Sequence, residues 1–383
     1  MKIAIVGGGI MGLSAAWALR RDGHEISLFE QGALPNPLGS SVDEHRLIRH
    51  PYGAERGYTR MIDVAYAAWE RLWADLGTRH YAATGTLVLD RGDRWTAATA
   101  AALEAERIPF RRLSVAESST SFPLLTADGI TGALLLETGG TLFAGDIVAA
   151  LADHLRTRGV SVMAQRTVRD IDPEHGRLTL SSGATVEAER IIVAAGPWAP
   201  RLLPGLPAQV TPSRQVVAYL EPPAEQAGRW RTHPMILDID PGAGFYLVPP
   251  RSRASGQISG LKIGDHSFTL TGDPDRDREA TEVEAGHLVR QVGARLRDIA
   301  RYRLREAKTC FYDVTSDERF VVKPVGARGW VLSGFSGHGF KFGAVIGLEL
   351  ARTLRGELAA DALTAWAAGG LPASPASMVK DRP

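Results

Sequence analysis

Cysteine, surplus charge and long apolar runs are all scarce in this sequence, and each shortage narrows what the protein can be. Cys310 is the only cysteine among 383 residues, so no disulfide can form within the chain. The 44 lysine and arginine residues nearly balance the 43 aspartate and glutamate residues, and the net charge of +1 does not indicate a polyanionic partner. We therefore expect no binding of nucleic acid.

The N-terminus also lacks room for a signal peptide, because the first expected strand begins at Lys2. No apolar run reaches the roughly 20 residues that are needed to cross a bilayer. With 44% hydrophobic and 23% charged residues, the composition is that of an ordinary globular protein, and the length suggests two or three domains. These features favour a soluble, cytoplasmic protein with no membrane contact.

The stretch KIAIVGGGIMGL at residues 2–13 carries the first clear motif. Residues 2–6 are typical of a buried parallel strand, and residues 13–21 are expected to be helical. Between them, Gly7, Gly9 and Gly12 have the spacing G-x-G-x-x-G, which permits a tight turn, close approach to a pyrophosphate, and close packing of helix on strand. A second strand at 25–30 ends in Glu30, where a ribose hydroxyl would be held. The combination predicts dinucleotide binding.

The rest of the chain changes character near residue 213. Before that point we expect helices at 61–78, 93–106 and 146–158 and strands at 84–89, 160–164, 168–171, 178–180 and 190–196. After it we expect short strands at 216–220, 235–238, 244–248 and 257–263, typical of an antiparallel sheet, then a helix opened by the capping box of Thr281 and Glu284. Strands at 319–325 and 330–333 precede a glycine-rich loop at 334–341 and a last long helix.

Residues 33–60 are loop-like and contain a cluster of basic side chains. His45, Arg46, Arg49 and His50 lie within a few residues of one another. A solvated basic loop is the simplest interpretation of such a cluster. Apolar residues at 47 and 48 interleave with the arginines, however, so we expect part of the segment to be packed.

Four separated stretches resemble one family. They are Gly39-Ser-Ser…Arg46-Leu-Ile-Arg49-His50, Gly260-Leu-Lys262-Ile-Gly, Cys310-Phe-Tyr312…Asp317-Glu318, and Gly334-Phe-Ser-Gly-His-Gly-Phe-Lys341-Phe. In this order they are similar to the monomeric sarcosine oxidase and N-methyltryptophan oxidase group of FAD-dependent amine oxidases. The last stretch is the most specific of the four.

The resemblance implies an α/β (α+β) protein of two domains. A Rossmann-like FAD-binding domain would be assembled from residues 1–82, 141–212 and 319–370. A catalytic domain with a mainly antiparallel sheet would comprise 83–140 and 213–318, and 371–383 would be a loose tail. The group also implies a monomer that acts on a small amine with O2.

The resemblance further implies a set of cofactor-binding residues. Cys310 would join the flavin through a thioether, although an isolated intracellular cysteine is usually a buried, inert thiol. Arg46 would lie close to the flavin ring, and the helix after Lys341 would direct its positive end toward the ring. The full set is Gly7, Gly9, Gly12, Glu30, Ser40, Ser41, Arg46, Val168, Ala195, Gly196, Trp198, Cys310, Gly337, Gly339 and Lys341. No metal site is expected.

Two cationic roles follow from the same resemblance. Arg49 and Lys341 would hold the substrate carboxylate, for which a guanidinium fork and an ammonium are suited. Lys262 would assist the reduction of oxygen by its fixed positive charge. The alternation of a strand places Lys262 on the face opposite its apolar neighbours, which is either solvent or the flavin cavity; the resemblance favours the cavity. Solvent-exposed positions are the alternative for all three.

Tyr246, His266 and Tyr312 resemble residues that line the amine pocket, with packing alone as the alternative role. Val42 departs from the group, because its sarcosine oxidases carry a histidine there, and the segment after Tyr246 is longer by residues 249–255. These departures concern the substrate.

The predicted function is oxidation of sarcosine or another N-methyl amino acid to an imine, then an aldehyde and an amine, with O2 reduced to H2O2. Alternatives are a cyclic imino acid or bulkier substrate such as pipecolate, N-methyltryptophan or a glycated amino acid, a flavin dehydrogenase with another acceptor, and a nicotinamide-dependent dehydrogenase.

Overall fold

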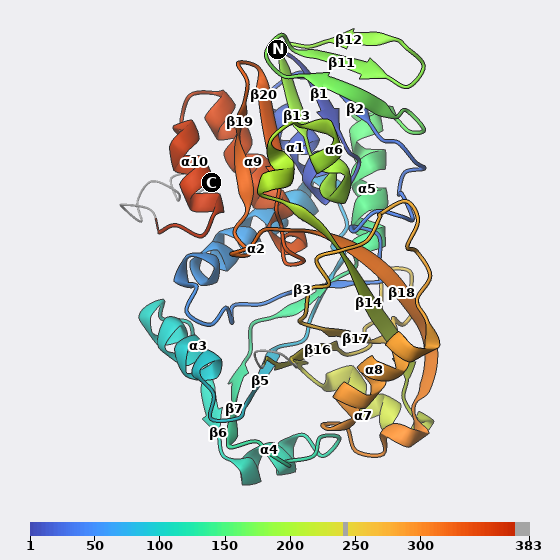
Figure 1. Ribbon diagram of the computed structural model, residues 1–383. Helices are drawn as coiled ribbons and strands as arrows, with labels where there is room; N and C mark the ends of the chain where they lie inside the picture. Colours follow the sequence, from blue (N-terminus) through green and yellow to red (C-terminus); the bar gives the residue numbers. More distant parts are fainter. Residues whose placement is uncertain (240–243, 372–383) are drawn as a thin grey trace.

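The computed structural model describes residues 1–239 and 244–371, and it contains two large sheets stacked along the length of the molecule. In Figure 1 the sheet that holds the N-terminal strand lies in the upper part and the larger sheet lies in the lower part. The expected loose tail falls, apart from its first residue, outside the described residues.

The upper sheet has six strands in the order β19-β20-β13-β1-β2-β9. Its strands are Val321–Val325 (β19), Gly329–Ser333 (β20), Arg190–Val193 (β13), Lys2–Val6 (β1), Glu25–Phe29 (β2) and Ser161–Met163 (β9). All neighbours are parallel except β19 and β20. Alternate residues of β1 enter different cores: Ile3 and Ile5 pack on one side, and Ala4 and Val6 pack on the other. Both faces of this sheet are therefore covered, as in nucleotide-binding folds.

Helices cover one face of the upper sheet, and a small sheet with a short helix covers the other. The first face carries α1 (Ile10–Arg21), α2 (Arg56–Leu76), α5 (Ala144–Thr157), α9 (Gly343–Leu354) and α10 (Ala360–Ala367). The second carries α6 (Ala199–Leu202) and the three-stranded sheet β10 (Val168–Asp172), β11 (Arg177–Leu180) and β12 (Thr185–Glu187).

The lower sheet has eight strands in the order β18-β14-β17-β16-β15-β5-β7-β6. They are Arg303–Val314 (β18), Thr211–Glu221 (β14), Leu261–Asp265 (β17), Phe245–Val248 (β16), Met235–Asp238 (β15), Thr86–Asp90 (β5), Gly132–Leu136 (β7) and Arg111–Leu113 (β6). Only β15 and β5 are parallel neighbours. The long pair β14 and β18 reaches up from this sheet to the upper one (Figure 1).

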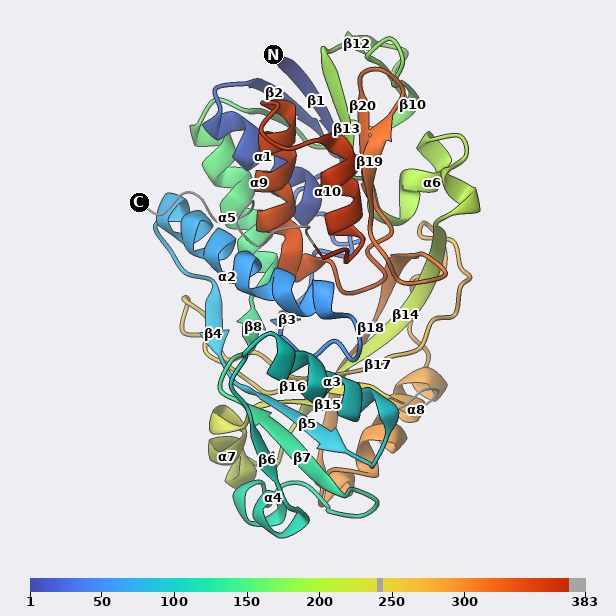
Figure 2. The same cartoon turned by 90° about the vertical axis from the view of Figure 1, so that its left-hand side faces the viewer.

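The remaining elements surround the lower sheet or join the two parts (Figure 2). The helices are α3 (Arg94–Ala105), α4 (Val115–Ser121), α7 (Ala227–Thr232) and α8 (Glu282–Gly293). A further three-stranded sheet is formed by β3 (Arg46–Ile48), β8 (Gly140–Leu142) and β4 (Tyr81–Ala83), in the order β3-β8-β4. The segment expected as a loop at 33–60 thus contains one strand and the start of α2.

The predicted fold class is confirmed, with a parallel nucleotide-type sheet and a second, mainly antiparallel one. The capping box of α8 is present, because Thr281 accepts the Glu284 N–H and Glu284 accepts the Thr281 N–H. The strand expected at 257–263 forms at Leu261–Asp265 instead. The domain boundaries stay a prediction.

Candidate active site

The larger cavity, of about 420 Å³, opens at the carboxyl ends of β1, β2 and β13. Val6, Phe29 and Ala194, which end or follow those strands, all line it. Ligands of open α/β sheets bind at such an edge. Gly7 makes the turn with a φ of +108°, and a Cβ there would lie 2.3 Å from the carbonyl oxygen of Ala194. The tight turn expected of Gly7 is therefore present, and the backbone there passes close to that of Ala194.

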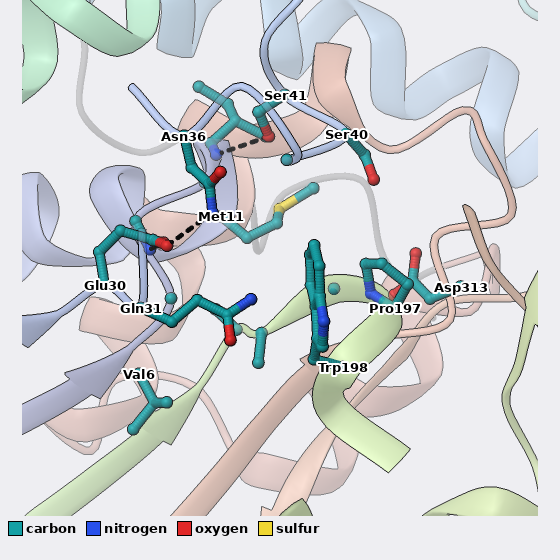
Figure 3. A pocket seen from close by; sticks show the side chains of 18 of the residues that line it. Val6, Met11, Glu30, Gln31, Asn36, Ser40, Ser41, Pro197, Trp198 and Asp313 are labelled. Atoms are coloured by element: carbon teal, nitrogen blue, oxygen red, sulfur yellow. Dashed lines mark hydrogen bonds between the residues drawn. The ribbon is translucent and has the colours of Figure 1, made fainter. Parts of the chain in front are cut away.

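Glu30 ties the glycine turn to the segment that follows β2 (Figure 3). Its Oε2 accepts the Gly8 N–H at 2.8 Å, and its Oε1 accepts from the Gly32 N–H and the Asn36 side chain, both at 2.9 Å. On the opposite side, Ser41 Oγ accepts the Ile10 N–H at 2.9 Å. The start of α1 is thus fixed from both sides.

The predicted cofactor residues mostly meet in this cavity. Its lining includes Gly7, Gly9, Glu30, Ser40, Ser41, Arg46, Val168, Ala195, Gly196, Trp198, Gly337 and Gly339, and also Val42. Gly12 lies beneath the turn, where a Cβ would be 1.9 Å from Gly7 O. Cys310 is buried in β18 and is not part of the lining; its Sγ lies 3.4 Å from a guanidinium nitrogen of Arg46.

A smaller cavity of about 70 Å³ adjoins the larger one. Arg46, Tyr312, Gly337 and Phe340 line both cavities, so the two share a wall. The six residues predicted to be catalytic, Lys262, Arg49, Lys341, Tyr246, His266 and Tyr312, are all in its lining. Residues 249–255 are not, so the extra loop does not shape the described part of this cavity.

Two buried cations face the smaller cavity from different elements. Arg49 follows β3, and Lys341 lies in the short 3₁₀ turn Phe340–Phe342 that precedes α9. Lys341 Nζ donates to the Tyr52 hydroxyl at 3.0 Å and to the His338 carbonyl at 2.8 Å. Among the described residues, Nε and one terminal nitrogen of Arg49 have no hydrogen-bond partner. Burial, together with the neighbouring Arg49, lowers the pKa of Lys341 well below its usual value.

Lys262 lies in β17 with its side chain only 1% exposed, while Leu261 and Ile263 pack into the core of the lower sheet. The alternation expected from the sequence therefore holds, and Lys262 faces the cavity rather than solvent. Its Nζ donates to Asp43 Oδ2 at 2.5 Å and to the His45 carbonyl at 3.0 Å. Asp43 was not predicted, because the adjacent acids Asp43 and Glu44 in a basic loop have no distinctive spacing.

Aromatic and imidazole groups complete the lining of the smaller cavity. The Lys262 ammonium lies 6.0 Å from the centre of the Tyr246 ring, and the rings of Phe268 and Tyr312 meet edge to face at 6.4 Å. His266 follows β17 at the cavity rim. The surrounding protein and the cations Arg49 and Lys341 lower the pKa of His266 to about 4, so its imidazole is neutral at pH 7.

The larger cavity fits a flavin dinucleotide. The Gly337 backbone approaches the Tyr312 ring so closely that a Cβ at Gly337 would lie 2.3 Å from it, and Arg46 places a positive charge on the wall that the two cavities share. Within the described ranges, no group of three or more His, Cys, Asp or Glu side chains is arranged to hold a metal ion.

Comparison with known proteins decides the family. The profile of the FAD dependent oxidoreductase (DAO) family matches residues 2–353. The chain belongs to this family. FAD is therefore its cofactor, and the prediction of an FAD-dependent amine oxidoreductase is confirmed at the level of the family.

Individual members agree with the predicted resemblance. The chain is 27% identical to monomeric sarcosine oxidase from Arthrobacter sp. (strain TE1826) over 360 residues, which cover 91% of each chain. It is 25% identical to N-methyl-L-tryptophan oxidase from Yersinia pestis (strain Pestoides F), with 90% of this chain and 92% of that one covered. The L-proline dehydrogenase from P. horikoshii has the same fold, with a TM-score of 0.79 at 17% identity and coverage of 97% and 99%.

No helix within the described residues is both long and apolar enough to cross a bilayer.

Proposed function

We propose that this member of the family oxidises a secondary amine that carries a carboxylate, such as sarcosine or another N-methyl amino acid, and passes the electrons to O2. The observation that carries the proposal is the pair of buried cations, Arg49 and Lys341, in a small cavity that shares a wall with the FAD-sized cavity. Within the residues described, neither cation forms an ion pair. A bound carboxylate would supply the missing anion.

Arg49 offers the substrate two free nitrogens, which suit a carboxylate better than a single donor does. Lys341 adds a second charge from a different element of the fold, held in place by Tyr52 and His338. Fixing the carboxylate at these two points orients the carbon next to the amine toward the shared wall. When bound, FAD supplies the two-electron acceptor there.

The amine has to be neutral before it is oxidised, and the site favours that state. Positive charges at Arg49, Lys341 and Lys262 disfavour another cation in the same cavity. The imidazole of His266 at the rim is kept neutral by burial and by Arg49 and Lys341, and it adds no further positive charge.

Lys262 is the group we assign to the oxygen step. When O2 takes up its first electron it becomes an anion, and a fixed ammonium beside it lowers the free energy of that state. Lys262 is buried and held by two hydrogen bonds, so its charge does not have to be brought into place.

We assign a covalent flavin link to Cys310, supported by the resemblance of its surrounding sequence and by its contact with Arg46, which lines both cavities. A mass spectrum of the denatured protein tests the link. We expect the mass of one FAD to stay with the wild-type chain and to be lost in Cys310→Ser.

The alternatives differ in substrate size and in acceptor. A described cavity of about 70 Å³ supports a small N-methyl amino acid over N-methyltryptophan or a glycated amino acid. The buried Lys262 supports O2 over another acceptor. The monomeric state and the cytoplasmic location stay predictions from the sequence.

A substrate panel with peroxide detection tests the proposal. We expect sarcosine or a similar N-methyl amino acid to give peroxide and an aldehyde, and the decarboxylated amine of the same size to give neither. Equal turnover of the two would refute the carboxylate requirement. Anaerobic reduction by substrate, followed by air, should restore the oxidised flavin spectrum; a spectrum that stays reduced in air would favour the dehydrogenase.

A further inference from the structure

The carboxylate of Asp43 joins the lower sheet to the segment that leads into β3. Its Oδ2 accepts from Lys262 Nζ of β17 at 2.5 Å and from an Arg46 guanidinium nitrogen of β3 at 2.8 Å. Its Oδ1 accepts from the Tyr219 hydroxyl of β14 and from the Glu44 N–H. Asp43 itself is 8% exposed and Tyr219 is fully buried. Four donors from three strands and the connecting loop therefore share one buried carboxylate.

We propose that Asp43 is a positioning residue that fixes the ammonium of Lys262 at the wall of the smaller cavity and keeps it protonated at neutral pH. The assignment concerns the protein's own residues and holds whether or not O2 is the acceptor. Its consequence for the oxygen step rests on the proposed function.

The geometry gives the reason. A buried ammonium is costly unless it is paired, and the other hydrogen bond of Lys262 goes to the uncharged carbonyl of His45. Arg46 is a further charge nearby, and it repels Lys262. Asp43 is thus the only carboxylate that contacts Lys262 among the described residues, and it compensates two cations at once.

The directions in which the pKa values of Lys262 and Asp43 move agree with this arrangement. Burial and Arg46 lower the pKa of Lys262 to about 8, and Asp43 opposes both effects. Burial alone would raise the pKa of Asp43, but Lys262 and Arg46 outweigh it and hold the value below its usual range. The other titratable groups around this pair are His45, Tyr219, Tyr246 and Cys310. Behind them, Arg305 and Lys308 lie over the Tyr219 ring, Arg253 acts on His45, and Glu44 pairs with Arg253 and Arg305.

The low lysine count makes a direct test practical. The chain contains only six lysines, Lys2, Lys262, Lys308, Lys323, Lys341 and Lys380. In holoprotein labelled with ¹³C at lysine Cε, the Lys262 signal is assigned by its loss in Lys262→Met and followed as a function of pH. For Asp43→Asn we expect its titration midpoint to fall by about 1 to 3 pH units, the usual effect of losing an opposite charge at this distance.

Two matched variants separate charge from packing. Tyr219→Phe removes one hydrogen bond to Asp43 but no charge, so the midpoint should move far less than in Asp43→Asn. Asp43→Glu keeps the charge and should restore much of the wild-type midpoint. An unchanged midpoint in Asp43→Asn, or an equal fall in Tyr219→Phe, would overturn the proposal.

If Asp43→Asn alone yields no folded protein, the double variant with Lys262→Met decides instead. Without Asp43, Lys262 and Arg46 are both left without a carboxylate, and the double variant removes one of these two charges. It should therefore fold and bind FAD again. A double variant as defective as the single one would overturn the proposal.

The same samples test the proposed function separately. We expect flavin reoxidation by O2 in Asp43→Asn to slow at a pH where Lys262 has become neutral. A shifted midpoint with an unchanged reoxidation rate would remove Lys262 from the oxygen step and leave the Asp43 assignment standing. An unshifted midpoint removes the Asp43 assignment whatever the rate is.

Discussion

At the residue scale, the clearest signal of function is where the chain places its lysines. Only six of its 44 basic residues are lysines, and two of the six, Lys262 and Lys341, are buried in the lining of one small cavity. Lysine is among the residues least often found buried, and a buried ammonium requires compensation by hydrogen bonds or opposite charge. Two such groups on one cavity indicate selection for a cationic site rather than for stability.

The first prediction concerns the oxygen step. In Lys262→Met the side chain keeps its approximate length and loses its charge, so flavin reoxidation by O2 should slow by about 100-fold or more, the order seen when one preorganised donor is removed. Flavin reduction by substrate under anaerobic conditions should change much less. Stopped-flow absorbance measures both steps. Lys323→Met, at a half-buried site in β19, is the matched control. Reoxidation of Lys262→Met at the wild-type rate would show that Lys262 has no role in the oxygen step.

The second prediction concerns the carboxylate. Arg49→Met should raise KM for an amino acid substrate by about 10- to 100-fold, because hydrogen bonds to a charged group contribute about 1.5–3 kcal/mol. Steady-state kinetics with peroxide detection gives the value. Arg79→Met, which breaks only an exposed pair with Glu70, provides the control. A KM that does not change would exclude Arg49 from substrate binding.

At the element scale, local patterns were predictable from the sequence and pairings between distant segments were not. The turn at Gly7, the helix after it and the capping box of α8 all depend on neighbouring residues and were predicted. The strand β3 forms only because β8, more than 90 positions away in sequence, pairs with it, so its segment was taken for a loop. For the same reason β18 was missed: much of its first half is exposed and polar, and its partner is β14.

The residues of the candidate site likewise fall into those that were predicted from the sequence and those that were not. The residues that share its cavities come from motifs that a family resemblance can identify, and the structure brings them together. Asp43, Tyr52 and Tyr219 act through contacts with residues far away in sequence, such as Lys262 and Lys341, and no spacing within their own segments indicates those contacts.

The third prediction concerns how closely α9 packs on α1. A Cβ at Gly347 of α9 would lie 2.4 Å from the backbone oxygen of Ser14 in α1, and backbone cannot move aside cheaply. Gly347→Ala should therefore destabilise the protein by about 1–3 kcal/mol, the usual cost of overpacking. Gly228→Ala in α7 is the matched control, because nothing lies within 4 Å of its Cβ position. Denaturant unfolding measures both variants; equal stabilities would contradict the close contact.

At the scale of the whole molecule, the larger cavity is where segments far apart in sequence meet. Its walls combine Val6 and Ala194 of the upper sheet region, Leu332 of β20, and Tyr312 and Asp313 of β18, which belongs to the lower sheet. In Figure 3, Glu30 and Asp313 lie on opposite sides of this cavity. A cofactor that fills it contacts both parts of the protein at once, so its binding should stabilise the molecule as a whole.

The last prediction tests this with Cys310→Ser, in which FAD is expected to dissociate. Adding FAD to the apoprotein of this variant at about 100 times its Kd should stabilise it by about 2.7 kcal/mol, which corresponds to a rise in Tm on the order of 5 °C. ADP occupies only the end of the cavity near the glycine turn. At the same concentration as FAD, it should therefore raise Tm less than FAD does. Thermal unfolding followed by circular dichroism gives both values. If ADP stabilised the protein as much as FAD, the flavin end of the cavity would make no contribution and the bridging role of the cofactor would be wrong.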